Sequence, residues 1–143
     1  MPKILLAEDN PADVYLIREA LGVDTRLDVD LLVANDGAEA LDYVHGRGPY
    51  ASLPLPDLIV LDLNLPKSDG TDVLQSIRDS KQFREIPVVI LTSSDSPRDR
   101  AAAVRLGASG YITKPSDLDA FLALGDILRS YVGGVGPETL ARF

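Results

Sequence analysis

Acidic, hydroxyl and amine side chains stand where short apolar runs of this sequence end. Glu8 and Asp9 follow one run, Asp62 follows a second, Thr92 closes a third and Lys114 comes just after a fourth. Carboxylates that lie close together either raise a pKa or hold a cation. Because the candidate ligands are all oxygen atoms, the pattern favours a hard divalent ion such as Mg²⁺ over zinc.

An ammonium group added to such a metal site would create a place for a second anion. Phosphoryl transfer needs this arrangement, with the metal and Lys114 offsetting the charge of the phosphoryl oxygens while Thr92 donates a hydrogen bond. Asp62 would then be the nucleophile that forms an acyl phosphate. Taken singly, each residue has a plainer interpretation as a helix cap, a strand-end partner or a solvated side chain, and for Asn10 we favour the helix cap.

The elements that would position these groups are short strands alternating with amphipathic stretches, a pattern typical of a parallel sheet with helices on both faces. In such a sheet the ligand site lies beyond the carboxyl ends of the strands. The sequence therefore predicts that the reactive side chains converge at one edge. The predicted strands are Lys3–Ala7, Val29–Ala34, Leu58–Leu63, Val88–Thr92 and Gly110–Thr113.

Capping residues mark the beginnings of several predicted helices. Asn10, Asp36 and Ser96 precede three of them, and Gly107 ends the helix that Ser96 begins. Ser116, with an acid three residues later, predicts the start of a last helix that continues to about residue 131.

The 143 residues, 45% of them hydrophobic, suit one compact domain over 1–132 and a short tail over 133–143, with no output domain. The net charge of -8 argues against nucleic-acid partners and anionic membranes. No apolar stretch approaches the roughly 20 residues of a membrane span. Since Met1-Pro2-Lys3 leads directly into a strand, we expect no signal peptide and a cytoplasmic protein.

Taken together, the motifs resemble the receiver domain of two-component response regulators over Lys3 to about Val132. They are Glu8-Asp9-Asn10, the run Val60–Pro66, Asp69-Gly70, Leu91-Thr92-Ser93 and Tyr111–Pro115. The resemblance implies an α/β, flavodoxin-like (βα)₅ fold with a parallel five-stranded sheet of order 2-1-3-4-5. It also implies phosphorylation of Asp62 by a phosphohistidine on a sensor histidine kinase.

The resemblance further implies how the metal is held. Asp9 and Asp62 would bind Mg²⁺ through their side chains, Asn64 through its backbone carbonyl and Glu8 through water.

The resemblance also implies which side chains meet the phosphoryl group. Lys114 would contact that group and Asp62, and Thr92 would donate a hydrogen bond to it. Tyr111 would be an aromatic switch that moves inward together with Thr92.

A narrower resemblance is to stand-alone receivers that are paired with phytochrome-type histidine kinases. It rests on Glu8–Leu21, the long Pro- and Gly-rich connection His45–Pro56, and Leu63–Gly70. Such receivers often self-associate, so a homodimer through the last strand and its flanking helices is expected.

We expect a signalling protein that catalyses only its own phosphorylation and slow dephosphorylation. Three other classes of protein remain as alternatives. An aspartyl-nucleophile phosphatase would want an acid two residues after the nucleophile, where this chain has Asn64. A pseudo-receiver scaffold would lack one of the acids, the Thr or the Lys. A dinucleotide-binding enzyme would need a Gly-rich turn after its first strand.

Overall fold

Five parallel strands form the centre of the computed structural model, which describes residues 2–22 and 29–132. The strand order is β2-β1-β3-β4-β5, as the receiver resemblance implied. The strands are β1 (Lys3–Ala7), β2 (Asp30–Ala34), β3 (Leu58–Leu61), β4 (Val88–Thr92) and β5 (Gly110–Thr113). The helices are α1 (Pro11–Leu21), α3 (Gly37–Val44), α4 (Gly70–Asp79), α5 (Pro97–Arg105), α6 (Leu118–Leu122) and α7 (Leu124–Ser130), with a 3₁₀ turn η1 (Gly48–Tyr50).

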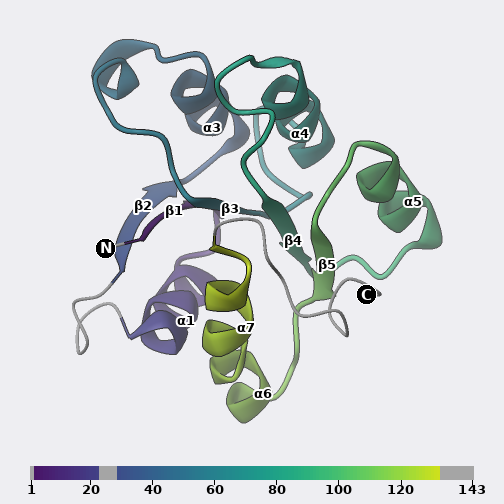
Figure 1. Ribbon diagram of the computed structural model, residues 1–143. Coiled ribbons are helices and arrows are strands. Elements are labelled where there is room, and N and C mark those ends of the chain that lie inside the picture. The colour runs from purple at the N-terminus through teal and green to yellow at the C-terminus, as the bar shows by residue number, and fades with distance from the viewer. Residues whose placement is uncertain (1, 23–28, 133–143) are drawn as a thin grey trace.

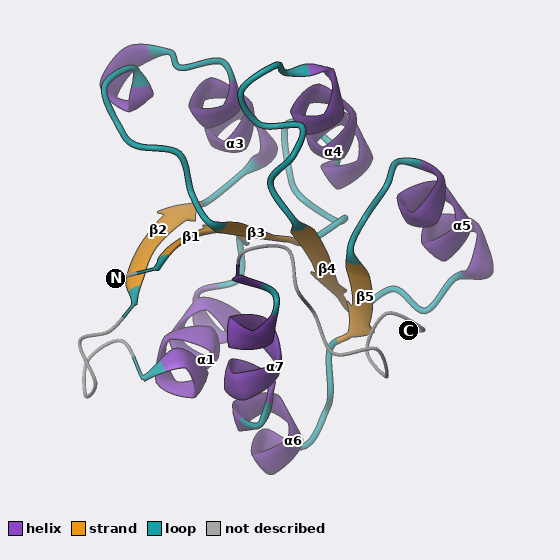
Figure 2. Ribbon diagram, in the orientation of Figure 1, coloured by secondary structure: helices purple, strands orange, loops and turns teal. Residues whose placement is uncertain are grey.

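The helices cover both faces of the sheet (Figures 1 and 2). Helices α3, α4 and α5 lie on one face, and α1, α6 and α7 lie on the other. Right-handed crossovers between parallel strands produce this three-layer arrangement.

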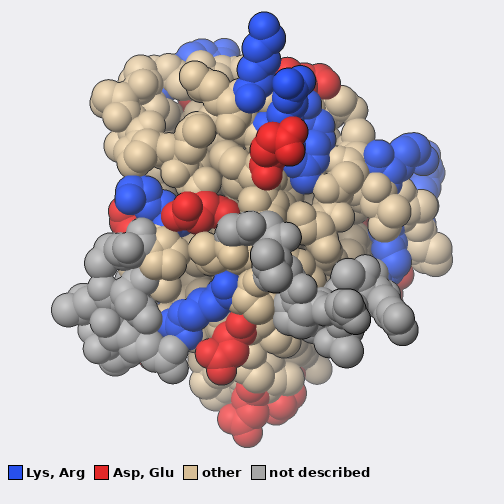
Figure 3. All heavy atoms as spheres, in the orientation of Figure 1, with Lys and Arg blue, Asp and Glu red and all other residues tan. Residues whose placement is uncertain are grey.

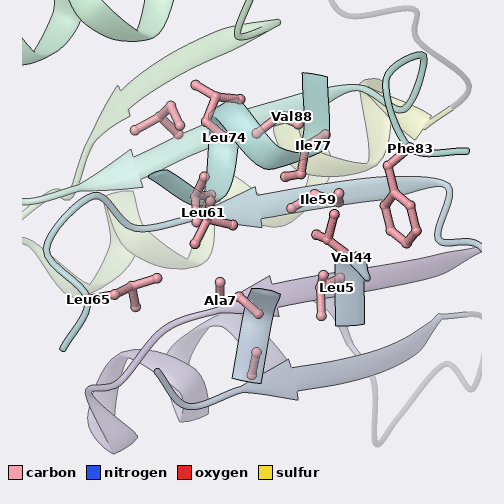
Figure 4. Packing of buried hydrophobic residues seen from close by; sticks show 14 of the residues in the cluster. Leu5, Ala7, Val44, Ile59, Leu61, Leu65, Leu74, Ile77, Phe83 and Val88 are labelled. Carbon is pink, nitrogen blue, oxygen red and sulfur yellow. The ribbon is translucent and has the colours of Figure 1, made fainter. Parts of the chain in front are cut away.

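Each inner strand sends alternate side chains to the two faces, so two cores form. Leu5, Ile59 and Leu61 belong to the core beneath α3 and α4 (Figure 4), together with Leu74 and Ile77 of α4. The opposite core contains the intervening strand residues and side chains of α1, α6 and α7, among them Ile4, Leu6, Leu58, Val60, Ile17, Phe121 and Leu128. Burial on both faces explains why these strands read as continuous apolar runs.

The predicted strand bounds are confirmed for β1, β4 and β5. Strand β2 begins one residue later than predicted, and β3 ends two residues earlier. The predicted caps are also confirmed, because the side chains of Asn10, Asp36 and Ser96 accept backbone N–H bonds at the starts of α1, α3 and α5. Gly107 has a φ of 78°, the left-handed conformation expected at a helix end.

The prediction for the last helix is wrong in two respects. Asp117, rather than Ser116, caps α6, because its carboxylate accepts the N–H of Ala120 at 3.0 Å. The predicted continuous helix is two helices that meet at Ala123, just before Gly125 brings α7 against α1.

The connection 45–56 contains η1, and Leu53 and Leu55 in it are exposed, as expected for a surface loop. Tyr43 donates a hydrogen bond to the carbonyl of Pro54 at 3.1 Å and so ties this loop to α3. The predicted tail, 133–143, lies outside the described residues. Within 2–22 and 29–132, no helix is long and apolar enough to cross a membrane.

Gly125 is where α7 approaches the backbone of α1. A Cβ at this position would lie 1.8 Å from the carbonyl oxygen of Ala20. Only a residue without a side chain therefore allows this contact, and it holds α1 in place beneath the sheet.

We expect Gly125→Ala to lower the free energy of unfolding by about 3 kcal/mol, because the clash outweighs the better helix propensity of Ala. Gly48→Ala is a suitable control: the added methyl group would meet nothing within 4 Å, so only its φ of 58° carries a cost. That cost is about 1–2 kcal/mol. Urea unfolding of both variants measures the difference, and equal losses would contradict the packing role of Gly125.

Candidate functional site

The carboxyl ends of β1 and β3 place the predicted acids side by side. Ala7 pairs with Leu61 in the parallel register, so Glu8 and Asp62 follow at neighbouring positions. The amide of Asp62 donates to the carbonyl of Ala7 at 3.0 Å. Carboxylate oxygens of Glu8, Asp9 and Asp62 all lie within 4.8 Å of one another.

Two of the three carboxylates are buried, and one is exposed. Glu8 is 1% exposed and Asp62 is 5% exposed, whereas Asp9 lies at the surface. Such a group of oxygen donors, open to solvent on one side, fits a hard divalent cation that keeps several waters.

Backbone groups orient the acidic side chains. Asn64 donates its amide to Asp62 Oδ1 at 3.1 Å, and Asn10 donates its amide to Glu8 Oε2 at 3.1 Å. Gly70 allows the loop between Asp62 and α4 to return to the site. A Cβ at this position would lie 2.4 Å from the carbonyl oxygen of Asp62, so only glycine fits there. Asn64 itself is exposed beside the cluster.

Lys114 brings its ammonium group into the middle of this cluster. Its backbone amide donates to the carbonyl of Thr92 at 2.7 Å and thus extends the pairing of β4 with β5. Its Nζ lies 2.7 Å from Glu8 Oε1, 3.1 Å from Asp62 Oδ2 and 2.7 Å from Asp13 Oδ2. Lys114 therefore contacts Asp62 in this structure.

Asp13 is the site residue that sequence reasoning missed. It lies in the first turn of α1, away from the strand ends where the other acids were predicted. No local pattern pointed to it, because its contact with Lys114 joins the first turn of α1 to the end of β5.

Burial and pairing shift the pKa of both partners of the buried ion pair. Burial raises the pKa of Glu8 from 4.5 to about 7, although Lys114 and the amide of Asn10 act in the opposite direction. Burial alone would lower the pKa of Lys114, but hydrogen bonds to Asp13 and Glu8 outweigh it and raise that pKa above its usual value.

Thr92 of β4 and Tyr111 of β5 are linked to each other through Ser94. Thr92 is fully buried, and its Oγ1 accepts the amide of Ser94 at 3.4 Å. The Tyr111 hydroxyl donates to the Ser94 carbonyl at 2.9 Å, and only 2% of Tyr111 is exposed. The guanidinium of Arg100 lies 4.5 Å from the centroid of the Tyr111 ring. Tyr111 therefore occupies an inward position held on two sides.

The Glu8 pKa predicts how the metal-free protein responds to pH. A carboxyl whose pKa rises on folding stabilises the protein fully below its unfolded pKa, and this contribution is lost as the pH rises through the folded pKa. In EDTA, we expect the free energy of unfolding of the parent to fall relative to Glu8→Gln between pH 4.5 and about 7. The relative fall should reach about 3 kcal/mol. Parallel pH curves from urea unfolding would contradict the shift.

Comparison with known proteins agrees with this geometry. Residues 4–124 match the response regulator receiver domain family. The chain is 42% identical over 115 residues to the response regulator Rcp1 of Synechocystis sp., which covers 80% of this chain and 78% of Rcp1.

Solved structures agree along nearly the whole chain. The phosphorylated cyanobacterial phytochrome response regulator RcpA superposes with a TM-score of 0.86 and 38% identity, covering 92% of this chain and 93% of RcpA. The Mn²⁺-bound form of response regulator Rcp1 gives a TM-score of 0.86 and 36% identity, covering 96% and 99%. On the match over residues 4–124 and the likeness to these proteins, this chain belongs to the response regulator receiver domain family, alongside phytochrome response regulators.

Proposed function

We propose that Asp62 accepts a phosphoryl group from a phosphohistidine of a sensor histidine kinase. The observation that carries this proposal is the placement of Asp62, a nearly buried carboxylate beside two further carboxylates and an ammonium group. A carboxylate oxygen of Asp62 forms a bond to phosphorus as the bond between phosphorus and the imidazole nitrogen breaks, and the electron pair of that bond remains on the nitrogen. Attack by water later releases inorganic phosphate and restores the carboxylate.

The cation in this proposal is Mg²⁺, which Asp9 and Asp62 would hold through their side chains, Asn64 through its backbone carbonyl and Glu8 through water. The oxygen-only donor set and the Mn²⁺-bound form of Rcp1 support a divalent ion. When bound, the ion supplies positive charge that offsets the carboxylates and the phosphoryl oxygens.

The remaining site residues respond to the phosphoryl group. Lys114 pairs with its oxygens, and Thr92 turns its hydroxyl toward them as a donor. Because Ser94 links Thr92 to Tyr111, a movement of Thr92 alters the contacts that hold the Tyr111 ring. The switch thus requires two arrangements of the same residues, whose populations phosphorylation shifts.

Likeness to the phytochrome response regulator RcpA supports a phytochrome-type histidine kinase as partner. The location that we propose is the cytoplasm. A homodimer would use edge strand β5 with its flanking helices, where Val104 of α5 is 64% exposed.

No nucleic-acid partner is proposed: the net charge is -8, and basic and acidic side chains lie interspersed on the face in Figure 3.

Neither alternative function is favoured by the comparisons. The matches are to response regulators rather than to phosphatases, and position 64 holds Asn where a phosphatase of this kind wants an acid. A pseudo-receiver would lack a member of the site, whereas Glu8, Asp9, Asp62 and Lys114 lie together in this structure. The proposed organisation is a receiver over 1–132, followed by a tail.

With acetyl phosphate and Mg²⁺, we expect the parent to be labelled and Asp62→Asn to lose at least about 99% of that labelling, since an amide is a far weaker nucleophile. Asp72→Asn, an exposed acid in the first turn of α4, is a matched control and should label like the parent. Phosphate-affinity electrophoresis measures both. Full labelling of Asp62→Asn would rule out Asp62 as the acceptor.

Asp9→Asn should weaken Mg²⁺ binding about tenfold or more, because a carboxylate oxygen is a better ligand for Mg²⁺ than an amide oxygen. Calorimetric titration measures the affinity, with Asp72→Asn again as control. An affinity unchanged in Asp9→Asn would show that Asp9 does not hold the ion.

A further inference from the structure

Asp13 contacts Lys114 but lies outside the group of acids that could hold a metal. Its Oδ2 is 2.7 Å from Lys114 Nζ, although the two residues are 101 positions apart in the sequence. The side chains are 19% and 11% exposed. Within the described residues, the group suited to a metal contains Glu8, Asp9 and Asp62, without Asp13.

The local fold fixes the position of Asp13. Asn10 caps α1 and accepts the amides of Ala12 and Asp13 at 2.9 and 3.3 Å, which sets the first turn. The close contact of Gly125 with Ala20 holds the same helix against α7. Asp13 therefore stands on a rigid element and faces the end of β5, where Lys114 enters the site.

The ammonium group has three donors, and the structure gives it three carboxylate partners. Two of these partners, Glu8 and Asp62, belong to the metal group, so an ammonium and a divalent cation compete for the same negative charge. Asp13 is the partner that lies outside that competition. Without its charge, Lys114 would pair more strongly with Glu8 and Asp62.

We propose that Asp13 is a positioning residue that holds Lys114 on the α1 side of Asp62 and so leaves carboxylate oxygens of Glu8 and Asp62 available to the cation. This inference rests on the proposed phosphoacceptor function and adds a residue to it. When the phosphoryl group is present, Lys114 exchanges its contact with Asp62 for phosphoryl oxygens and keeps the contact with Asp13. Asp13 thus acts through Lys114 and touches neither the phosphoryl group nor the ion.

A double-mutant cycle separates this role from a simple loss of charge. Asp13→Asn keeps the size and hydrogen-bonding capacity of the side chain, and Lys114→Met removes the ammonium on which Asp13 is proposed to act. Mg²⁺ affinity is titrated at physiological ionic strength for the parent, both single variants and the double variant. Asp72→Asn removes one charge from the first turn of another helix and is the matched control.

We expect Asp13→Asn to weaken Mg²⁺ binding about tenfold when Lys114 is present. In the Lys114→Met background the same substitution should change the affinity by no more than about twofold, the size expected of a screened charge. Asp72→Asn should lie within this smaller range. Equal losses in the two backgrounds, or no loss in either, would overturn the inference.

Two further measurements locate any failure. In EDTA, urea unfolding of the four proteins tests the ion pair without any metal: non-additive losses support it, and additive losses overturn it.

Labelling of the parent by acetyl phosphate tests the proposed function separately. If the parent is labelled at Asp62 while the Mg²⁺ cycle shows no coupling, only the role of Asp13 fails. If the parent is not labelled, the proposed function fails and this inference falls with it.

Discussion

The ammonium group of Lys114 holds together three carboxylates that would otherwise repel one another. Glu8 and Asp62 are nearly buried, and two buried like charges destabilise a folded protein unless a counterion or protonation relieves them. Lys114 relieves them by direct contact, and Asp13 shares the same ammonium from the surface side. The site is therefore built around a charge balance that an entering divalent cation or phosphoryl group must disturb.

The fold brings these charges together through the parallel sheet. Strands β1, β3, β4 and β5 end at the same edge, so residues far apart in the sequence arrive side by side. Close backbone contacts fix the details, since Gly70 lets a loop return beside Asp62 and Gly125 seats α1 against α7. Both cores contribute to this precision, because each inner strand is packed on its two faces.

Much of this could be predicted from local patterns. Short apolar runs located the strands, and caps such as Asn10 and Asp36 located helix starts, because both signals act within a few residues. The last helix was harder. The neighbour of the predicted cap Ser116, Asp117, begins the helix because its carboxylate reaches the amide of Ala120. The break at Ala123 coincides with the approach of α7 to α1, a tertiary contact.

The site residues, too, divide into those that local patterns predict and those that depend on tertiary contacts. Glu8, Asp9, Asp62 and Lys114 were predictable because each stands at a strand end, whereas the partnership of Asp13 with Lys114 joins the start of α1 to the end of β5. Only the folded chain reveals such a contact. The link from Thr92 through Ser94 to Tyr111 is of the same kind, since it depends on where the loop after β4 runs.

The central claim is that the phosphoryl group resides on the carboxylate of Asp62. Borohydride reduces an aspartyl phosphate to homoserine and so marks the residue that carried the group. After treatment with acetyl phosphate, Mg²⁺ and then borohydride, mass spectrometry of the proteolytic peptides should find homoserine at position 62. Homoserine at position 9 or 13, with Asp62 unchanged, would contradict the account.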